Sequence, residues 1–288
     1  MNILECRGLS KSFGGVHAVR DLELAVGEGE TLGIIGPNGA GKTTLFNVLA
    51  GSTRPDSGTV VFRGDDVSRY GPERRARLGL IRTFQNGRTF ANMSAEENLL
   101  LGAHASRTAV RSGPALGAIE LAQALLPFGP FAREERRLHA EAMALLESFG
   151  DRLAPRAGEN AFSFSYANRR RIEIARALAA HPVLLLLDEP TAGMNPTETI
   201  EILEFLRGLK ARGLTMIVIE HKLPLIMQIS DRIIVMDEGS KIAEGRPEDV
   251  VRDARVIEAY LGTVHSHRAT TTKVEGVDVD GTADLEGY

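Results

Sequence analysis

The chain has 288 residues, of which 43% are hydrophobic and 25% charged, with a formal net charge of −4. This is ordinary globular composition for one large domain or two small ones, and it argues against a nucleic-acid binder that acts through bulk positive charge. The single cysteine, Cys6, excludes an intramolecular disulfide and suits a reducing cytoplasmic setting. We expect neither a secretory signal nor a membrane span, because the N-terminus lacks a basic start and no apolar run reaches ~18 residues.

Strand and turn signals dominate the N-terminal part. Residues 17–26 (HAVRDLELAV) are typical of a strand that ends in the turn GEGE, and residues 54–67 indicate a turn, a strand and a second turn. Short apolar runs also occur along the chain with helical patterns between them, which predicts an α/β fold with a parallel sheet. These runs are TLGIIG (31–36), VLLLLD (183–188), MIVIE (216–220) and RIIVMD (232–237).

A helical stretch separates the strand-bearing parts. Residues 93–146 are rich in Ala, Leu, Glu and Arg, and we interpret them as a helical insertion. The last residues, 263–288, are polar and aperiodic, which predicts a disordered tail. We therefore expect one domain over residues 1–262, with a helical insertion over about 88–178.

A phosphate-binding loop is the strongest signal in the chain. The pattern G-x-x-x-x-G-K-T occurs as Gly36, Gly41, Lys42 and Thr43, with a predicted strand before it and an amphipathic helix after it. Glycines let backbone N–H groups wrap a phosphate closely, and a helix that begins near Gly41 points its positive dipole end at the anion. Lys42 adds a full charge at the β and γ phosphates, and the Thr43 hydroxyl can ligate Mg²⁺.

Two carboxylates follow a buried apolar run. Asp188 should emerge at the carboxyl end of a central strand, where α/β sheets place their ligand sites. Hydrolysis of ATP needs a carboxylate for Mg²⁺ and a group that orients water. We expect Asp188 to hold the metal and Glu189 to polarise the attacking water. Two acids that abut buried apolar residues are costly unless they serve a charge.

The stretch FSYANRRRIEIARAL (164–178) suggests an anion site at the start of a helix. Ser165 stands just before a run with helical spacing, and Arg169, Arg170 and Arg171 follow on its first turns.

These three features together resemble the ATP-binding cassette (ABC) ATPases. The resemblance rests on GPNGAGKTT (36–44), on LLLLDEP (184–190) and on the serine-led helix entry with RRRIEIARAL (169–178), and it covers nearly all of residues 1–262. It implies an ABC-type P-loop NTPase core with an N-terminal antiparallel β subdomain and a helical insertion subdomain. It also implies that two cassettes dimerise head to tail around two ATP molecules, so that Ser165 faces the γ-phosphate of the partner's ATP.

The resemblance assigns roles to further positions. Phe13, in KSFGG, lies where an aromatic ring stacks on adenine; Gln85, in IRTFQN, lies where a glutamine senses Mg²⁺ and the membrane partner; and His221, in MIVIEH, lies where a histidine contacts the γ-phosphate. The implied catalytic residues are Glu189, His221 and Gln85, and the implied Mg²⁺ ligands are Thr43, Gln85 and Asp188. The implied nucleotide contacts are Phe13, Val19, Gly36, Asn38, Gly39, Gly41, Lys42, Thr43, Thr44, Ser165 and Ala167.

Within the family, the chain looks like the ATP-binding subunits of branched-chain amino acid importers. The segments that carry this likeness are FGGVHAV (13–19), GMNPTET (193–199) and EGRPEDVVRDARVIEAYLG (244–262). The likeness implies a second ABC ATPase subunit or a second copy of this chain, two transmembrane permease subunits and, indirectly, an external substrate-binding protein. It implies no nucleic-acid partner and a peripheral place on the cytoplasmic face of the cell membrane. Relatives that serve urea, amide or lipopolysaccharide transport remain alternatives.

Two other functions compete with transport. A soluble cassette that acts on ribosomes or DNA would usually carry two cassettes or a long coiled coil, and this chain has one cassette and no sustained heptads. A GTPase-type switch would need a guanine-reading Asn-Lys-x-Asp stretch, which the sequence lacks. We therefore prefer the transport ATPase.

Local departures from the family pattern suggest a modified signature site. Where the family usually has Leu-Ser-Gly-Gly-Gln, this chain has Ala167 in place of the second glycine and Asn168 in place of the glutamine. Asn168 should close a capping box poorly, and the Ala167 methyl should crowd the phosphate, so we expect a weakened site. Asn195 replaces a more usual aspartate, and we expect it to cap a helix in which Pro196 is N1 and Glu198 is N3.

The segment NGRTFANM (86–93) is where the family docks a helix of the membrane subunit. Phe90 and Met93 are apolar in this stretch, which suggests a contact surface, although a place in the core of the insertion is equally compatible with the sequence.

Overall fold

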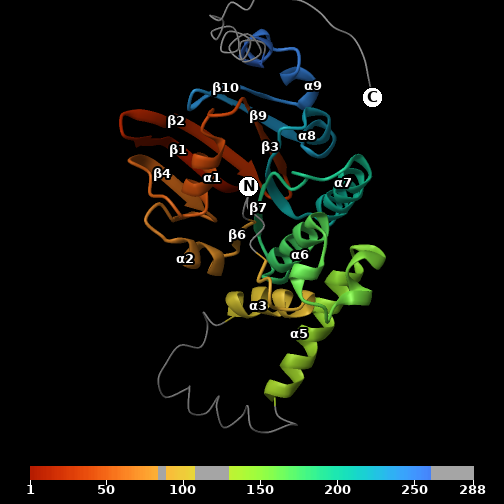
Figure 1. Cartoon of the computed structure of the whole chain (residues 1–288). Helices are drawn as coiled ribbons and strands as arrows, with labels where there is room; N and C mark the ends of the chain where they lie inside the picture. Colours follow the sequence, from red (N-terminus) through yellow and green to blue (C-terminus); the bar gives the residue numbers. More distant parts are fainter. Residues whose placement is uncertain (84–88, 108–129, 261–288) are drawn as a thin grey trace, which may run out of the picture.

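A computed structural model describes residues 1–83, 89–107 and 130–260. Two sheets organise these residues (Figure 1). One has four antiparallel strands in the order β2-β1-β4-β5, with bounds β1 Asn2–Phe13, β2 Val16–Gly27, β4 Ser57–Phe62 and β5 Asp65–Asp66. The other has six strands in the order β10-β9-β3-β8-β7-β6. Its strands are β3 Thr31–Ile35, β6 Leu80–Arg82, β7 Leu184–Asp188, β8 Thr215–Ile219, β9 Arg232–Asp237 and β10 Ser240–Gly245.

The six-stranded sheet is the centre of the molecule and is parallel except at β10. Each of the four apolar runs in the sequence forms one of its strands, so the predicted parallel sheet is confirmed. In β7, Leu184 and Leu186 pack into one core cluster, whereas Leu185 and Leu187 pack into a second. The sheet is therefore buried on both faces, and this explains why its strands lack polar alternation. The strand β10 was not predicted, because its sequence carries no apolar run of that kind.

Helices cover both faces of this sheet. On one side α1 (Lys42–Leu49) packs between the two sheets, with Leu45 and Phe46 in the core that they share. The second core holds the other face of the sheet together with the remaining large helices. The further helices are α2 Pro72–Arg77, α3 Ala95–Arg107, α5 Pro130–Glu147, α6 Tyr166–Ala179, α7 Pro196–Ala211, α8 Leu223–Ile229 and α9 Pro247–Val250, with short 3-10 turns at Gly150–Arg152, Ala154–Arg156 and Ala161–Ser163.

The helical part lies at one end of the molecule, where α3, α5 and α6 pack together (Figure 1). The Ser94 hydroxyl accepts the Glu97 N–H, and the Glu97 carboxylate accepts the Ser94 N–H, so a capping box begins α3. The predicted tail at residues 263–288 lies outside the described residues, as does part of the predicted insertion.

Arg75 joins α2 to the end of α1. Its side chain is fully buried, and its guanidinium donates to the carbonyls of Val48 and Leu49 at 2.6 Å each and to that of Val67 at 2.7 Å. The last carbonyls of a helix have no partner within the helix. The Gly51 N–H donates to the Val48 carbonyl at 3.1 Å, and Arg75 supplies the donor for the buried Leu49 carbonyl. Burial lowers the Arg75 pKa to about 10, which still leaves it charged at neutral pH.

Candidate functional site

The loop between β3 and α1 has the shape of a phosphate cradle. Gly36 and Gly41 have φ of 153° and 95°, a backbone conformation that L side chains rarely adopt. A Cβ on Gly41 would also lie 2.0 Å from the Ala18 carbonyl oxygen, so only glycine fits. The Lys42 ammonium donates to the carbonyls of Gly36 at 2.7 Å and Pro37 at 2.8 Å. Burial is the main cause that lowers the Lys42 pKa, and the nearby carboxylates of Glu189 and Asp188 oppose it.

A cavity of about 550 Å³ opens over this loop. It is lined by the loop, by the start of β2 and by the residues after β7 and β8; these include Val16, Ala18, Asn38, Gly39, Gly41, Lys42, Thr43, Thr44, Glu189 and His221. Its volume suits a nucleotide-sized ligand. Most of the residues that were assigned to nucleotide contact or catalysis thus line one space, although they come from three separate parts of the sequence.

One predicted nucleotide contact is not available in this structure. Val19 is fully buried in the core between the sheets, whereas Val16 and Ala18 line the cavity. Within residues 16–20, Val19 alone does not line the cavity, because its side chain turns into the core. Phe13 is 51% exposed and pairs with Val16 across the β1–β2 turn, but it is not among the residues that line the cavity.

The two acids after β7 have different environments. Asp188 is fully buried, its Oδ2 lies 2.8 Å from Arg82 Nη2, and its Oδ1 has no hydrogen-bond partner among the described residues. An unpaired buried carboxylate oxygen is costly, so this atom fits a cation. In nucleotide sites Mg²⁺ takes one or two carboxylates and completes its shell with phosphates and waters, so Asp188 and the Thr43 hydroxyl form a suitable donor set.

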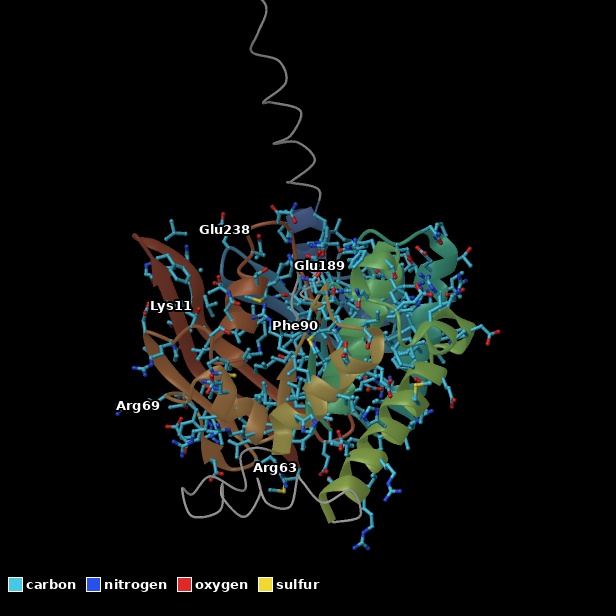
Figure 2. The ribbon with its side chains drawn as sticks, turned by 60° about the horizontal axis from the view of Figure 1, so that its bottom comes forward. Lys11, Arg63, Arg69, Phe90, Glu189 and Glu238 are labelled. Carbon is cyan, nitrogen blue, oxygen red and sulfur yellow. The ribbon has the colours of Figure 1, made fainter. Side chains whose placement is uncertain are left out.

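Glu189 is held over the cavity rather than in the core. Its backbone is left-handed, with φ of 48°, and its N–H donates to the Ile219 carbonyl at 2.9 Å. Glu189 Oε1 lies 2.6 Å from His221 Nε2, and the two side chains are 18% and 44% exposed. A carboxylate with this access can orient a water molecule at the phosphate loop. Figure 2 shows Glu189 among the side chains around the sheet.

Ser165 and Ala167 do not line this cavity. Ser165 is the exposed N-cap of α6, and its hydroxyl accepts the Asn168 N–H at 3.3 Å. Ala167 is only 4% exposed, so its methyl group lies in the core. The steric cost that we expected from this methyl group at a partner's phosphate stays a prediction. Ser165 is therefore exposed but takes no part in the cavity over the phosphate loop of its own chain.

Two of the three arginines of this helix were misinterpreted from the sequence. Arg170 and Arg171 are 1% and 2% exposed and do not face an anion at the helix start. Arg170 pairs with Glu173 at 2.6 Å and donates to the Asp188 and Glu189 carbonyls, which connects α6 to the end of β7. Arg171 pairs with Glu201 at 2.6 Å. A helical wheel places both residues on the side of Ile174, and that signal could have revealed their burial.

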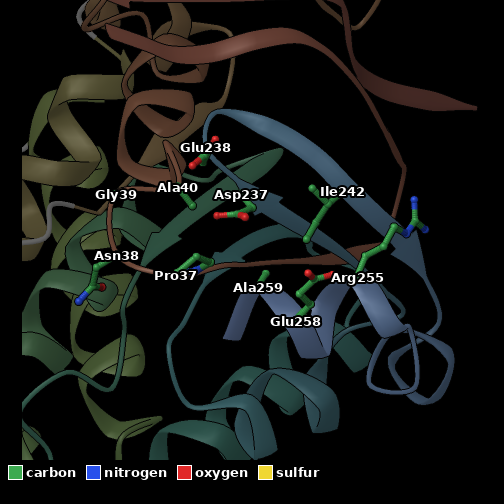
Figure 3. Close-up of a pocket in the computed structure, with 10 residues that line it drawn as sticks. All are labelled: Pro37, Asn38, Gly39, Ala40, Asp237, Glu238, Ile242, Arg255, Glu258 and Ala259. Atoms are coloured by element: carbon green, nitrogen blue, oxygen red, sulfur yellow. The ribbon is translucent and has the colours of Figure 1, made fainter. Parts of the chain in front are cut away.

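A second cavity, of about 570 Å³, lies on the other side of the phosphate loop. Figure 3 shows residues 37–40 on one side of it and the helical segment that carries Glu258 and Ala259 on the other. The Gly36 N–H also bonds the hydroxyl of Tyr260, whose pKa burial raises. The C-terminal segment therefore supports the back of the loop. Gln85, the remaining predicted catalytic residue and metal ligand, lies outside the described residues.

Comparisons with known proteins agree with this geometry. The family model for ABC transporters matches residues 19–192. The chain belongs to the ABC transporter ATPase family. A second family model, for branched-chain amino acid ATP-binding cassette transporters, matches residues 240–266 of this cassette. The predicted family, its fold and its ATPase class are thereby confirmed.

Curated relatives match the cassette over most of its length. The high-affinity branched-chain amino acid transport ATP-binding protein LivG of Salmonella typhimurium is 39% identical over 262 residues, which are 90% of this chain and 98% of LivG. The lipopolysaccharide export system ATP-binding protein LptB of Acidithiobacillus ferridurans is 34% identical over 260 residues, or 90% and 97% of the two chains. Among solved structures, a nucleotide-free ATP-binding cassette from an ABC transporter has a TM-score of 0.74 at 31% identity, covering 90% and 99% of the two chains.

An apolar groove lies apart from the nucleotide cavity. It has a volume of about 570 Å³ and lies between β6, the start of the helical part and α6; its lining includes Ile81, Arg82, Phe90, Leu101, Arg176 and Ala177. Phe90 is 49% exposed (Figure 2), and the Arg176 guanidinium lies 5.3 Å from its ring centroid. The buried Asn98 side chain bonds the Phe90 N–H and carbonyl, so this loop is held in place. In the parts of the chain that the structure describes, no helix has the length and apolarity to cross a membrane.

Proposed function

We propose that the cassette is the ATP-hydrolysing subunit of an ABC importer for branched-chain amino acids. The observation that carries the catalytic part is the cavity in which the phosphate loop, Glu189 and His221 meet. The observation that favours this cargo class is the match of residues 240–266 to the branched-chain amino acid transporter model, together with LivG as a 39% identical relative. The 34% identity to LptB keeps lipopolysaccharide transport as the second candidate.

Each part of the site has a role in hydrolysis. The loop N–H groups and the Lys42 ammonium bind the phosphates, and binding draws Lys42 away from the Gly36 and Pro37 carbonyls. Phe13 supplies an aromatic face for adenine. Glu189 accepts a hydrogen bond from the attacking water and orients it, and His221 holds the Glu189 carboxylate and reaches the γ-phosphate. Thr43, Asp188 and Gln85 would hold Mg²⁺, which supplies charge neutralisation at the β and γ phosphates.

A second cassette completes the site. Ser165 and the N-terminus of α6 are exposed but lie outside the cavity of their own chain. The positive end of a helix favours an anion, and a head-to-tail dimer would bring it to the γ-phosphate in the partner's cradle. ATP would then join the two subunits, and its hydrolysis would release them. The partner is a second copy of this chain or a related ABC subunit.

We assign the apolar groove around Phe90 to the contact with a permease subunit. Each of the two cassettes would bind one permease, so the transporter would contain two. The apolar lining of the groove and its position beside the helical part suit a short amphipathic helix. This contact would place the cassette on the cytoplasmic face of the membrane, and an external substrate-binding protein would act on it only through the permeases.

Reconstitution tests the whole proposal. The cassette, its partner cassette, the permeases and the binding protein would be placed in liposomes, and ATP-dependent uptake of labelled leucine, isoleucine and valine would be compared with that of urea. We expect uptake of the branched-chain amino acids only, and no uptake with Glu189→Gln in both cassettes. Uptake of urea alone, or ATP hydrolysis that transports neither solute, would overturn the assigned cargo.

A further inference from the structure

Arg82 is the last residue of β6 and belongs to two sites at once. Its guanidinium Nη2 lies 2.8 Å from Asp188 Oδ2, and its Nη1 donates to Asn47 Oδ1 at 2.6 Å. The same side chain lines the apolar groove that also contains Phe90. Only 8% of the Arg82 side chain is exposed. No other residue among those described both lines this groove and forms an ion pair with Asp188.

The fork of the guanidinium fixes the orientation of the Asp188 carboxylate. A planar guanidinium presents donors in a rigid geometry, so its hold on Asn47 also determines its direction toward Asp188. Oδ2 is engaged by Arg82, whereas Oδ1 has no partner among the described residues. The pair therefore leaves one defined oxygen for a cation. A lysine at this position would keep the charge but could not bond both partners in the same plane.

The surroundings of Arg82 make this pair sensitive to events in the groove. The guanidinium carbon lies 5.6 Å from the Phe46 ring centroid, and the Asp188 side chain is fully buried, so the pair already sits in a medium of low polarity. A ligand in the groove would remove water from the remaining exposed part of Arg82. Less water strengthens the attraction between opposite charges, so docking should hold the Asp188 carboxylate more firmly.

We propose that Arg82 is a positioning residue that couples occupation of the apolar groove to cation binding at Asp188. The inference rests on the proposed function of the groove as the permease contact. Coupling between two binding sites is reciprocal, so docking should raise the affinity for Mg²⁺ by the same factor by which Mg²⁺ strengthens docking. The groove and the metal carboxylate would then communicate through a single side chain.

The first test uses the isolated cassette and a fluorescent ATP analogue. Its binding is titrated with Mg²⁺ in wild type, Arg82→Lys and Asn47→Ala. We expect the half-saturating Mg²⁺ concentration to rise about fivefold or more in both variants, while the dissociation constant for the analogue in EDTA changes less than about twofold. Arg152→Lys is the matched control, because Arg152 pairs with Glu201 at 2.6 Å and lines neither site. It should leave both values unchanged.

Two outcomes of this test overturn the positioning role. One is an unchanged Mg²⁺ requirement in both variants, which would make the pair purely structural. The other is a lowered requirement, which would mean that Arg82 competes with the cation. Thermal unfolding identifies a variant that fails to fold. If Arg82→Lys is unfolded, Asn47→Ala decides, because it keeps the ion pair with Asp188 and removes only the second anchor.

The second test compares the free cassette with the cassette docked on its permeases in nanodiscs. In wild type, docking should lower the half-saturating Mg²⁺ concentration about fivefold, and in Asn47→Ala the ratio should approach one. Phe90→Glu tests the groove as the permease contact separately from the coupling through Arg82. If it assembles normally, the groove is not the permease contact and the proposed function of that surface fails. If Phe90→Glu abolishes assembly but the wild-type ratio is one, the groove assignment holds and the coupling through Arg82 is wrong.

Discussion

His221 Nε2 lies 2.6 Å from Glu189 Oε1, although the two residues are separated by 32 positions in the sequence. The parallel pairing of β7 with β8 explains this contact, because Asp188 is in register with Ile219. Glu189 follows β7 directly, and His221 lies two residues after the end of β8. Glu189 has a left-handed backbone, with φ of 48°. Such a conformation is costly for a non-glycine residue and persists where the surroundings impose it, as at functional sites.

The substitution Glu189→Gln should separate binding from hydrolysis. It preserves the size of the side chain and removes the negative charge that orients water, so ATP turnover should fall by about 10²-fold to 10⁴-fold. ATP affinity should stay within about threefold of wild type, because Glu189 does not hold the phosphates. Because bound ATP is not hydrolysed, a dimer of cassettes should accumulate. Size-exclusion chromatography with MgATP and the partner subunit can detect this dimer. Turnover at the wild-type rate would remove Glu189 from the mechanism.

Lys42→Ala should act on nucleotide binding. In the free chain Lys42 satisfies two loop carbonyls, and burial lowers its pKa, so the charge is already partly separated from water before the phosphates arrive. Loss of a charged hydrogen bond of about 1.5–3 kcal/mol weakens ATP affinity by about 10-fold to 100-fold. Isothermal titration measures this change, and hydrolysis should fall to background. Glu189→Gln serves as the control that binds ATP but does not hydrolyse it.

Arg75→Met should destabilise the cassette without any direct effect on the site. The variant leaves the Leu49 carbonyl buried and unpaired at the end of α1, whereas the Val48 carbonyl keeps the Gly51 N–H, and an unpaired group costs about 1–3 kcal/mol. We expect the free energy of unfolding to fall by about 1–3 kcal/mol. The matched control is Arg74→Met, because the exposed Arg74 side chain stacks on the Tyr70 ring and has no bond to these carbonyls; it should change stability by about 0.5 kcal/mol or less. Urea denaturation with an unchanged m-value measures both.

The sequence predicted the parts of the site that depend on local pattern. The phosphate loop, the strand before Asp188 and the cap at α7 each have a short-range cause, and the Asn195 capping box is confirmed at 2.9 Å and 3.1 Å. The side chains that support the site could not be predicted in this way. Arg82 meets Asp188 across 106 positions, a contact that exists only once β6 pairs with β7.

The wrong predictions of which side chains face the cavity or the solvent also arise from long-range packing. Val19 and Ala18 are neighbours in one strand, and only the tertiary position of β2 decides which of them faces the cavity. Arg170 and Arg171 look like surface cations in sequence, but α6 turns them into the interior, where Glu173 and Glu201 compensate their charge. The sequence pattern therefore predicted the phosphate loop and the acidic segment after β7. The burial of Val19 and the ion pairs of the two arginines depend instead on how the elements pack.

The last prediction concerns the start of α6. Asn168 does not close a capping box, because its Oδ1 accepts from Arg171 Nη1 at 2.6 Å, so the Ser165 N–H lacks the reciprocal partner that glutamine would provide. Asn168→Gln should reach back to that N–H and fix Ser165 for the partner's phosphate. Hydrolysis at the cradle of an unmodified partner cassette should then rise about two- to fivefold, since a cap is worth about 0.5–1 kcal/mol. ATP affinity at Lys42 of the same chain should not change.

Ala167→Gly provides the contrast in the same assay. The Ala167 methyl group is buried, so its removal opens no room for a phosphate and instead costs about 1 kcal/mol in helix propensity and packing. We expect lower stability and no gain in hydrolysis, and the double variant with Asn168→Gln should be no faster than Asn168→Gln alone. Turnover of each variant is measured with a partner cassette whose own Leu-Ser-Gly-Gly-Gln segment is intact, and the comparison shows which substitution raises hydrolysis. A gain from Ala167→Gly alone would mean that the methyl group does meet the phosphate in the dimer, and that α6 rearranges when the two cassettes close.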